Sequence, residues 1–466
     1  MSTINWKLEV EKYHKELIER TQDFLQIPSV LDESTSKKGQ PFGVEIGKAL
    51  DFILEIGKKD EFFVKNVDGY AGVIELGEGK DMIGVLGHLD VVPAGKGWDY
   101  PPFGAPLENG RIYARGAMDD KGPTMAAYFA MKIIKELKLP LSKRIRLIIG
   151  TDEESDWRCV EYYQKHEEMP SFGIAPDADF PIINAEKGLL DVELQFKGDS
   201  DCQSNLELIE FNSGERLNMV PDTARASIIA GTSEDQVRLK FERWLSESEY
   251  LGRAYVEGEH LILQCEGVSV HGSTPEKGIN AGLLLTEFLL TLSLQERAEQ
   301  YLSFINEYID SDGQKLNIAC SDSVSGALTV NAGIFNFSKE EGIIGLNIRV
   351  PVEVPMDKAL FAIKQQAEEL SFTCQVKSEM NANFVSEQEE EIRILQSVYE
   401  RQTGQQAVLL STGGATYARA LEKGVAFGAQ FPGREDLAHQ KNEYIIVEDL
   451  LKMTAIYAEA LYELAK

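Results

Sequence analysis

The stretch from residue 144 to residue 154 constrains the fold more than any other part of the sequence. Residues 144–150, RIRLIIG, alternate and then become apolar, as a buried strand does. The segment TDEE follows directly and places Glu153 beside Glu154. Open α/β sheets bind their ligands just beyond the carboxyl ends of strands. Two adjacent carboxylates at that position suit a metal ligand and a proton acceptor. The alternative is an acidic loop that begins a helix.

Composition and charge exclude several classes of partner. The chain has 466 residues, of which 43% are hydrophobic, and 47 basic against 76 acidic residues give a net charge of −29. This negative charge repels nucleic acid and anionic lipid. The sequence contains no apolar run near the roughly 20 residues that a membrane helix needs. We therefore expect neither a nucleic-acid partner nor a membrane partner.

The N-terminus and the cysteines favour a cytoplasmic protein. Residues 1–6, MSTINW, lack the charged and then apolar profile of a signal peptide. The chain has five scattered cysteines and no C-x-x-C pair, a pattern typical of reduced thiols. These cysteines are Cys159, Cys202, Cys265, Cys320 and Cys374.

The order of helical and strand patterns predicts an α/β domain that is interrupted by an insertion. Before the insertion, strands are expected at 61–67, 70–76, 82–86 and 144–150, and helices at 6–26, 44–56 and 123–137. Residues 189–196 alternate like a half-exposed strand, and the segment that follows suggests α+β layers. A helix ending near 402, a strand at 407–410 and a helix at 447–464 complete the α/β domain. The predicted divisions are 1–187, the inserted 188–381, and 382–466.

Histidines and carboxylates recur in the predicted α/β domain, four of them after apolar, strand-like runs. Alone, each is a weak signal that a turn or a helix cap explains better. Together, two histidines and three carboxylates suit a pair of divalent ions such as zinc, manganese or cobalt, about 3.5–4 Å apart and bridged by one carboxylate. The candidates are His88, Asp119, Glu154, Asp177 and His439.

The motifs around these residues resemble those of a known family. GHLD (87–90), RGAMDDKG (115–122), TDEE (151–154), APDADF (175–180) and the late His439 are similar to the signature set of the co-catalytic di-zinc exopeptidases. Aminoacylase, succinyl-diaminopimelate desuccinylase, glutamate carboxypeptidase and carnosinase belong to that family. The resemblance spans essentially the whole chain. Segments 98–104, 271–281 and 411–419 look most like the bacterial dipeptidase PepV group. The resemblance implies a zinc-exopeptidase-like catalytic domain, with a mixed sheet between helices, interrupted by an α+β lid.

The resemblance also implies a ligand set. His88 and Asp177 would hold one metal ion, Glu154 and His439 the other, and Asp119 would bridge them. The expected cofactor is two divalent ions per chain, zinc before manganese or cobalt.

The resemblance gives roles to two further residues beside the metal ligands. Asp120 would lie just outside the set of ligands. Asp90 would orient His88 through its second ring nitrogen. Glu153 would be the general base that takes a proton from the bridging water and passes it to the leaving amine.

The inserted lid would supply the substrate contacts. By resemblance, His271 and Asn218 would meet the developing oxyanion. Arg349 would bind the terminal carboxylate of the substrate, and the backbone of Gly413 and Gly414 would approach the same group. The alternatives are an edge-strand salt bridge for Arg349 and a turn histidine for His271.

The resulting hypothesis is a metal-dependent dipeptidase that acts on short peptides with a free amino end. The alternative enzyme is an N-acyl-amino-acid deacylase or desuccinylase that uses the same two metals. A catalytically inactive binding module with this fold is the alternative from another class. Because the insertion is longer than the lid of simpler relatives, we expect a doubled lid and a monomer.

Overall fold

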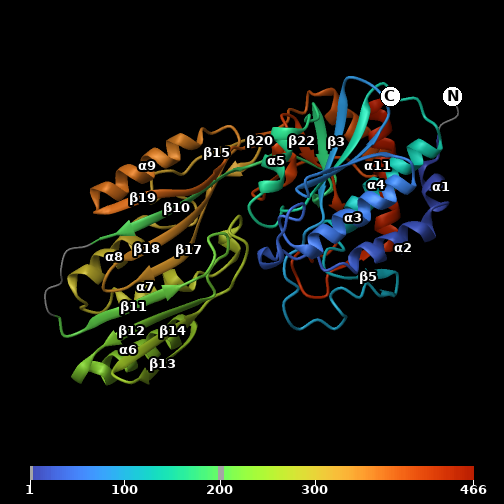
Figure 1. Cartoon of the computed structure of the whole chain (residues 1–466). Coiled ribbons are helices and arrows are strands. Elements are labelled where there is room, and N and C mark those ends of the chain that lie inside the picture. The colour runs from blue at the N-terminus through green and yellow to red at the C-terminus, as the bar shows by residue number, and fades with distance from the viewer. Residues whose placement is uncertain (1–3, 198–203) are drawn as a thin grey trace. The chain divides into compact units, whose positions relative to one another are not determined.

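The computed structural model describes residues 4–197 and 204–466, so Cys202 lies outside the described residues. The chain forms two compact units (Figure 1). The first takes in the chain up to Ala185, then Asn383–Ser411 and Ala415–Lys466. The second consists of Glu186–Ala382 and Thr412–Gly414. The chain therefore leaves the first unit twice, for the long segment 186–382 and for the short segment 412–414, and returns to it each time.

Within the described residues, the first unit is built on a mixed nine-stranded sheet. Eight strands follow in the order β1-β2-β6-β3-β7-β22-β9-β20, and β21 pairs with β9. Strand β3 runs parallel to both its neighbours, β6 and β7, whereas β2 is antiparallel to β6. The strands are β1 (Phe63–Val67), β2 (Ala71–Leu76), β3 (Met82–His88), β6 (Arg144–Gly150), β7 (Phe172–Ala175), β9 (Ile182–Glu186), β20 (Asn383–Phe384), β21 (Leu409–Thr412) and β22 (Gly424–Ala426).

Helices pack against this sheet, and α4 and α11 contact each other as well as β3 and β6. The helix predicted at 6–26 is two helices, because the Tyr13 amide bonds to the carbonyl of Val10 and tightens the turn between them. The helices are α1 (Trp6–Glu11), α2 (His14–Leu25), α3 (Val44–Lys59), α4 (Lys121–Glu136), α5 (Arg158–His166), α10 (Glu390–Thr403) and α11 (Val447–Ala465), with short 3-10 helices η1 (Glu33–Thr35) and η4 (Tyr417–Ala420).

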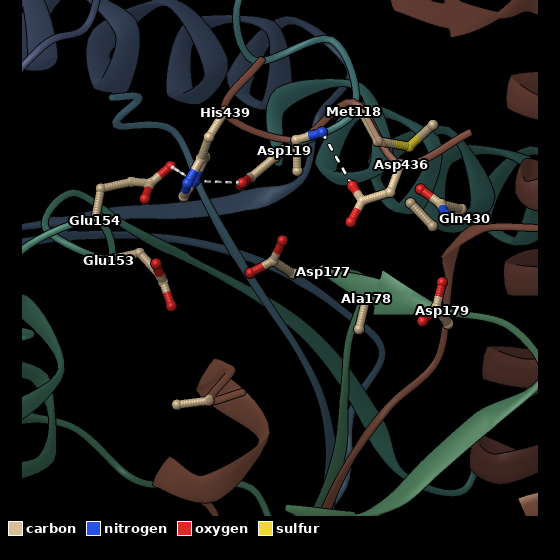
Figure 2. A pocket seen from close by; sticks show the side chains of 13 residues that line it. Met118, Asp119, Glu153, Glu154, Asp177, Ala178, Asp179, Gln430, Asp436 and His439 are labelled. Carbon is tan, nitrogen blue, oxygen red and sulfur yellow. Dashed lines mark hydrogen bonds and ion pairs between the residues drawn. The ribbon is translucent and has the colours of Figure 1, made fainter. Parts of the chain in front are cut away.

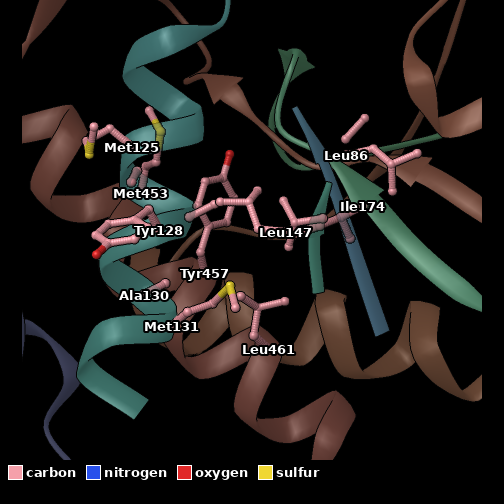
Figure 3. Close-up of a cluster of buried hydrophobic side chains, with 14 of the residues drawn as sticks. Leu86, Met125, Tyr128, Ala130, Met131, Leu147, Ile174, Met453, Tyr457 and Leu461 are labelled. Carbon is pink, nitrogen blue, oxygen red and sulfur yellow. The ribbon is translucent and has the colours of Figure 1, made fainter. Parts of the chain in front are cut away.

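The core of this unit lies between α4, α11 and the central strands (Figure 3). Leu147 of β6 and Ile174 of β7 are fully buried there, together with Tyr457 and Leu461 of α11. Burying this apolar surface stabilises the fold by about 25 cal/mol per Å². It also fixes the ends of β3, β6 and β7, from which the site residues project.

Two small sheets join segments that are distant in the sequence. Strand β5 (Arg111–Tyr113) pairs with β4 (Leu107–Glu108) and with β24 (Tyr444–Ile446), and Tyr113 lies opposite Tyr444. Strand β8 (Ala178–Asp179) pairs in parallel with β23 (Ala429–Gln430). These pairings bring the two parts of the first unit together around its loops.

The second unit contains an antiparallel sheet of eight strands in the order β13-β14-β12-β11-β17-β18-β10-β19. Strand β10 alternates as expected: Leu190, Val192 and Leu194 are buried, and the residues between them are half-buried. Its strands are β10 (Gly188–Phe196), β11 (Glu207–Ser213), β12 (Thr223–Ile229), β13 (Leu251–Glu257), β14 (His260–Glu266), β17 (Thr329–Phe337), β18 (Gly342–Val350) and β19 (Phe372–Met380), beside the pair β15 (Ser321–Asp322) and β16 (Gly326–Ala327).

Helices accompany this second sheet and share its core. Helix α6 contacts β13 and β14, α7 contacts β12 and β14, and α9 contacts β10 and β19. The helices are α6 (Glu234–Ser248), α7 (Ala281–Leu289), α8 (Glu296–Tyr308) and α9 (Met356–Glu369), with 3-10 helices η2 (Gly231–Ser233) and η3 (Pro275–Lys277). Across 4–197 and 204–466, no helix combines the length and the apolarity needed to cross a lipid bilayer.

Candidate metal centre

Three of the expected site residues follow three neighbouring parallel strands. His88 is the last residue of β3, Glu154 lies shortly after β6, and Asp177 lies shortly after β7. Strand β3 lies between the other two. The chain passes from β3 to β6 on one side of it and then to β7 on the other side. Such a switch point opens a crevice at the carboxyl ends of the strands, which is where ligands bind in sheets of this kind.

The other two expected ligands come from loops beside this crevice. Asp119 precedes Asp120, the residue that caps the N-terminus of α4. His439 lies in the loop between β23 and β24. The Nε2 atom of His439 is 3.0 Å from Oδ2 of Asp119 and 3.0 Å from Oε1 of Glu154 (Figure 2). Loops that are far apart in the sequence thus meet at one point.

The five expected ligands and Glu153, which was predicted as the general base, form two clusters of three residues whose candidate ligand atoms lie within 4.8 Å of one another. One cluster contains His88, Glu153 and Asp177, and the other contains Asp119, Glu154 and His439. Asp119 connects them, because its Oδ1 lies 3.0 Å from Nε2 of His88 while its Oδ2 faces His439. A carboxylate with one oxygen toward each cluster has the geometry of a bridging ligand.

The orientation of the His88 ring fits a cation at this point. Its Nδ1 lies 3.0 Å from the backbone carbonyl oxygen of Asp90, which can only accept a hydrogen bond. In the neutral form that ligates a metal, the ring therefore carries its proton on Nδ1 and presents a lone pair at Nε2. That lone pair faces the carboxylates of Asp119 and Asp177, at 3.0 and 3.6 Å. Acceptors that converge in this way are the donor set that a divalent metal ion requires.

Asp90 contacts the His88 ring through its backbone carbonyl, whereas its carboxylate accepts a hydrogen bond from Glu154. Its carbonyl oxygen contacts the His88 ring, whereas its Oδ1 lies 3.6 Å from Nδ1 of that ring. Its Oδ2 accepts the backbone N–H of Glu154 at 3.0 Å. Asp90 thus joins the ends of β3 and β6 and positions one residue of each cluster.

The adjacent acidic pair divides into two different environments. Asp119 points into the clusters, and Asp120 is fully buried beneath them. Oδ2 of Asp120 accepts the backbone N–H of His88 at 3.0 Å and the hydroxyl of Thr124 at 2.9 Å. Through these two hydrogen bonds Asp120 supports the end of β3. Burial raises the pKa of Asp120 well above its ordinary value.

The protonation equilibria show how much negative charge is concentrated here. Burial raises the pKa of Glu153 well above its ordinary value, that of Glu154 to about 7 and that of Asp177 to about 6, and the charge of Asp119 adds to each shift. Burial also opposes ionisation of Asp119, but His439 and His88 outweigh it and lower its pKa. Hydrogen bonds to Asp119 and Glu154 raise the pKa of His439 to about 11. Two imidazoles face four carboxylates, so the centre fits added positive charge.

A cavity of about 250 Å³ opens over the two clusters (Figure 2). Its wall includes Asp179 and Asp436, to which sequence reasoning assigned no role. The lining residues are Met118, Asp119, Glu153, Glu154, Asp177, Ala178, Asp179, Ala415, Ala429, Gln430, Asp436, Ala438 and His439. The cavity has room for metal ions and part of a small substrate.

Sequence reasoning also gave no role to Glu443. This residue is fully buried and accepts the backbone N–H groups of Met118 and Asp119, at 2.8 and 3.2 Å. The available signal was weak: an acidic residue four positions after His439 and directly before a short apolar strand.

The residues expected to bind substrate gather within the second unit. The carbonyl oxygen of Asn218 accepts the N–H of Gly272 at 2.7 Å, which places Asn218 beside His271. Arg349 is only 3% exposed and donates from Nη1 to the carbonyl oxygen of Gly413 at 2.7 Å. A Cβ on Gly413 would lie 2.7 Å from Cβ of Ser273, so the glycine permits a close approach to the His271 loop.

Comparison with known proteins gives consistent matches along the chain. Residues 84–463 match the model of peptidase family M20/M25/M40. The "Putative dipeptidase YtjP" of Bacillus subtilis is 50% identical over 467 aligned positions, which cover 99% of this chain and all of that protein. The crystal structure of human carnosine dipeptidase 1 has a TM-score of 0.60 at 13% identity and covers 98% of both chains. An M20 family metallo-carboxypeptidase of Sulfolobus solfataricus, Sso-CP2, has a TM-score of 0.58 at 19% identity over 96% of this chain and 98% of its own. The two structures share the fold: a mixed catalytic sheet and a separate antiparallel sheet.

Proposed function

Because the chain belongs to peptidase family M20/M25/M40, we propose that it is a dipeptidase with a dinuclear metal centre. The observation that carries the proposal is the carboxylate of Asp119, whose two oxygens each lie 3.0 Å from the Nε2 atom of a different histidine. The name of the Bacillus subtilis relative, 50% identical over its full length, supports dipeptides as the substrates.

The proposed ligands follow the two clusters. His88 and Asp177 would hold one divalent ion, Glu154 and His439 would hold the other, and Asp119, which lies 3.0 Å from both histidines, would bind both. The imidazole and carboxylate donors suit zinc first, and manganese or cobalt as substitutes. When bound, two such ions polarise the carbonyl of the scissile bond and lower the pKa of a water molecule beside it.

Glu153 is the proposed proton carrier of the reaction. Its carboxylate lines the cavity, and burial raises its pKa well above the ordinary value of a glutamate. A carboxylate with a raised pKa is a better base at neutral pH than an exposed one. Glu153 takes a proton from the water as the water oxygen bonds to the carbonyl carbon, and transfers that proton to the amine nitrogen as the C–N bond breaks. Peptide hydrolysis is complete when the amine and the carboxylate product separate.

The proposed substrate contacts lie in the second unit, whose residues 188–381 we assign as the lid. His271 and Asn218 stabilise the oxyanion that forms at the scissile carbonyl. Arg349, with the backbone of Gly413 and Gly414, binds the terminal carboxylate of the dipeptide. The eight-stranded sheet of this unit supports a doubled lid that supplies His271 within its own chain, which fits a monomer. A cytoplasmic location completes the proposal.

A substrate panel tests the proposed function. Purified protein loaded with zinc is incubated with dipeptides, tripeptides, and acetyl- and succinyl-amino acids, and the released amino acids are quantified. We expect dipeptides with a free amino end to give the largest kcat/KM. A preference for the acylated amino acids would instead identify a deacylase that uses the same centre. Gel filtration of the same sample tests the monomer.

A further inference from the structure

A buried ion pair between Arg115 and Glu443 joins the two loops that carry Asp119 and His439. Nη1 of Arg115 lies 2.6 Å from Oε2 of Glu443, and the two side chains are 2% and 0% exposed. Neither residue lines the cavity over the metal clusters. The pair therefore lies behind the centre.

The small sheet in the first unit explains why these two residues meet. Strand β5 ends at Tyr113, opposite Tyr444, which begins β24. One step further along this pairing, the N–H of Ala114 donates to the carbonyl oxygen of Glu443 at 3.0 Å. Arg115 and Glu443 thus lie at the point where the segments of β5 and β24 separate toward the loops that carry Asp119 and His439.

The carboxylate of Glu443 is fully occupied by donors from one of these loops. Its Oε2 accepts from Arg115 and from the N–H of Gly116 at 3.1 Å. Its Oε1 accepts from the N–H groups of Met118 and Asp119, at 2.8 and 3.2 Å. A carboxylate has about four lone-pair directions, and here each is matched by a donor. Glu443 therefore has no spare lone pair with which to bind a metal or substrate.

Arg115 reaches the other loop. Its Nη2 donates to the backbone carbonyl of His439 at 3.1 Å, and its Nη1 donates to that of Gln440 at 3.2 Å. The ring of Trp98 lies 5.3 Å from the guanidinium carbon and helps to cover the charge. The rigid guanidinium fork thus connects the His439 backbone to the carboxylate that holds the Asp119 backbone.

We propose that Arg115 and Glu443 are positioning residues that set the geometry of Asp119 and His439 for metal binding. The inference rests on the proposed dinuclear centre. It adds a shared support behind the bridging ligand and one terminal ligand. The cluster of Asp119, Glu154 and His439 depends on this support, whereas His88 and Asp177 are held by β3 and β7. Disturbing the pair should therefore weaken the binding of one metal ion more than the binding of the other.

The test is the variant Glu443→Gln, which keeps the shape of the side chain. The glutamine amide has a single acceptor oxygen. Its NH2 group would therefore face two of the four groups that donate hydrogen bonds to the carboxylate, and those two bonds would be lost. Wild-type protein and variant are loaded with Zn²⁺, and metal release to a chromogenic chelator is followed in time. We expect E443Q to release one of its two ions about 10- to 100-fold faster than wild type, the range typical of residues that orient metal ligands.

Arg146→Met is the matched control, because it breaks another buried pair in the same unit. Nε of Arg146 lies 2.5 Å from Oε2 of Glu75, and the side chains are 7% and 12% exposed. This variant should lower the unfolding temperature and leave the release of both ions unchanged. Arg115→Lys is the second test variant: it keeps the charge but loses the fork, so it should also speed the release of one ion.

The outcomes separate this inference from the proposed function. If E443Q and R115K release both ions at the wild-type rate, the positioning role is wrong while the dinuclear centre stands. If R146M speeds release as much as they do, the effect is general destabilisation and the positioning role is again wrong. Wild-type protein that binds no Zn²⁺ would contradict the proposed function, and the positioning role with it. Should E443Q not fold, the release rate of R115K decides the question.

Discussion

Glu153 and Glu154 are neighbours in the chain, yet their carboxylates belong to different clusters. Glu153 groups with His88 and Asp177, and Glu154 groups with Asp119 and His439. The turn after β6 is held by Asp90, whose Oδ2 accepts the N–H of Glu154 at 3.0 Å. Two identical side chains on consecutive residues can therefore take different roles.

Glu153→Gln should lower kcat by about 10²- to 10⁴-fold, because the amide cannot accept the proton of the attacking water. The variant should still bind two zinc ions, which metal analysis of the dialysed protein measures. Asp156→Asn is the control, since its side chain is 77% exposed in the same loop, and it should keep wild-type activity. Binding of a single ion by E153Q would show instead that Glu153 is a ligand of the His88 cluster.

Removing the metals should destabilise the first unit. The buried carboxylates of Asp119, Glu154 and Asp177 repel one another when no cation lies between them. Each ion stabilises the folded state by about 2.7 kcal/mol when its free concentration is about 100 times its Kd. Thermal unfolding after chelation should therefore begin several degrees lower, and zinc should restore both the unfolding temperature and the activity. Equal unfolding temperatures with and without metal would contradict a centre at these residues.

The stability of the metal-free protein should fall as pH rises from about 5 to about 8. Burial raises the pKa of Glu154 from 4.5 to about 7 and that of Asp177 from 3.8 to about 6. Hydrogen bonds to Asp119 raise the pKa of His439 from 6.5 to about 11. In this pH range the folded chain thus binds more protons than the unfolded chain, so the free energy of unfolding decreases with pH.

Bound metal should reverse this trend, because the ions replace the protons that the folded site retains. The difference in unfolding temperature between the loaded and the metal-free protein should grow with pH across this range. Calorimetric scans of both forms at several pH values measure it. If the stability of the metal-free protein rises toward pH 8, the raised pKa values of Glu154, Asp177 and His439 are wrong.

Arg349→Lys should raise KM for a dipeptide about 10- to 100-fold with a smaller effect on kcat. Lysine cannot form the two parallel bonds that a guanidinium makes with a carboxylate, and a hydrogen bond to a charged group contributes about 1.5–3 kcal/mol. The same dipeptide with an amidated carboxyl end should be a poor substrate for both proteins. Arg225→Lys, in an exposed pair with Glu257, serves as the control arginine of the second unit. Equal hydrolysis of acid and amide by wild type would argue against carboxylate binding.

Leu147→Ala should lower the free energy of unfolding of the first unit by about 2–5 kcal/mol, the range for leucines truncated in a packed core. Leu147 is fully buried in β6, whereas Leu8 of α1 is 62% exposed. Leu8→Ala should therefore change stability little. Denaturant unfolding of both variants measures the difference, and folded L147A should keep the wild-type KM. Similar effects of the two substitutions would contradict the packing around β6.

The alternation at 189–196 predicted β10, whose buried residues alternate with half-buried ones. Apolar runs predicted two further elements, although these are buried on nearly every side. The helix expected at 123–137 is α4 at Lys121–Glu136, and the strand expected at 144–150 is β6. Strand β17 was not identified, because Asn331, Gly333 and Asn336 interrupt its apolar residues and no regular alternation marks it as a strand. Strand β22 has only three residues and gives no measurable period.

The candidate metal ligands were accessible to sequence reasoning because each belongs to a recognisable motif after a predicted strand or before a predicted helix. Glu443 was not, because its partners Arg115 and Asp119 lie more than 300 residues earlier in the chain. An isolated glutamate before a short strand looks like an ordinary surface charge. Only the pairing of β5 with β24 reveals that it is buried among donors.

That pairing also decides when the centre is completed during synthesis. The ribosome releases β5 before the whole second unit and β24 after it. Until residues 439–443 emerge, the growing chain presents Asp119 without His439 and without the Glu443 carboxylate that holds the Asp119 backbone. The candidate metal centre can therefore be assembled only after His439 and Glu443 have been translated, and a truncated product that ends before His439 lacks a complete centre.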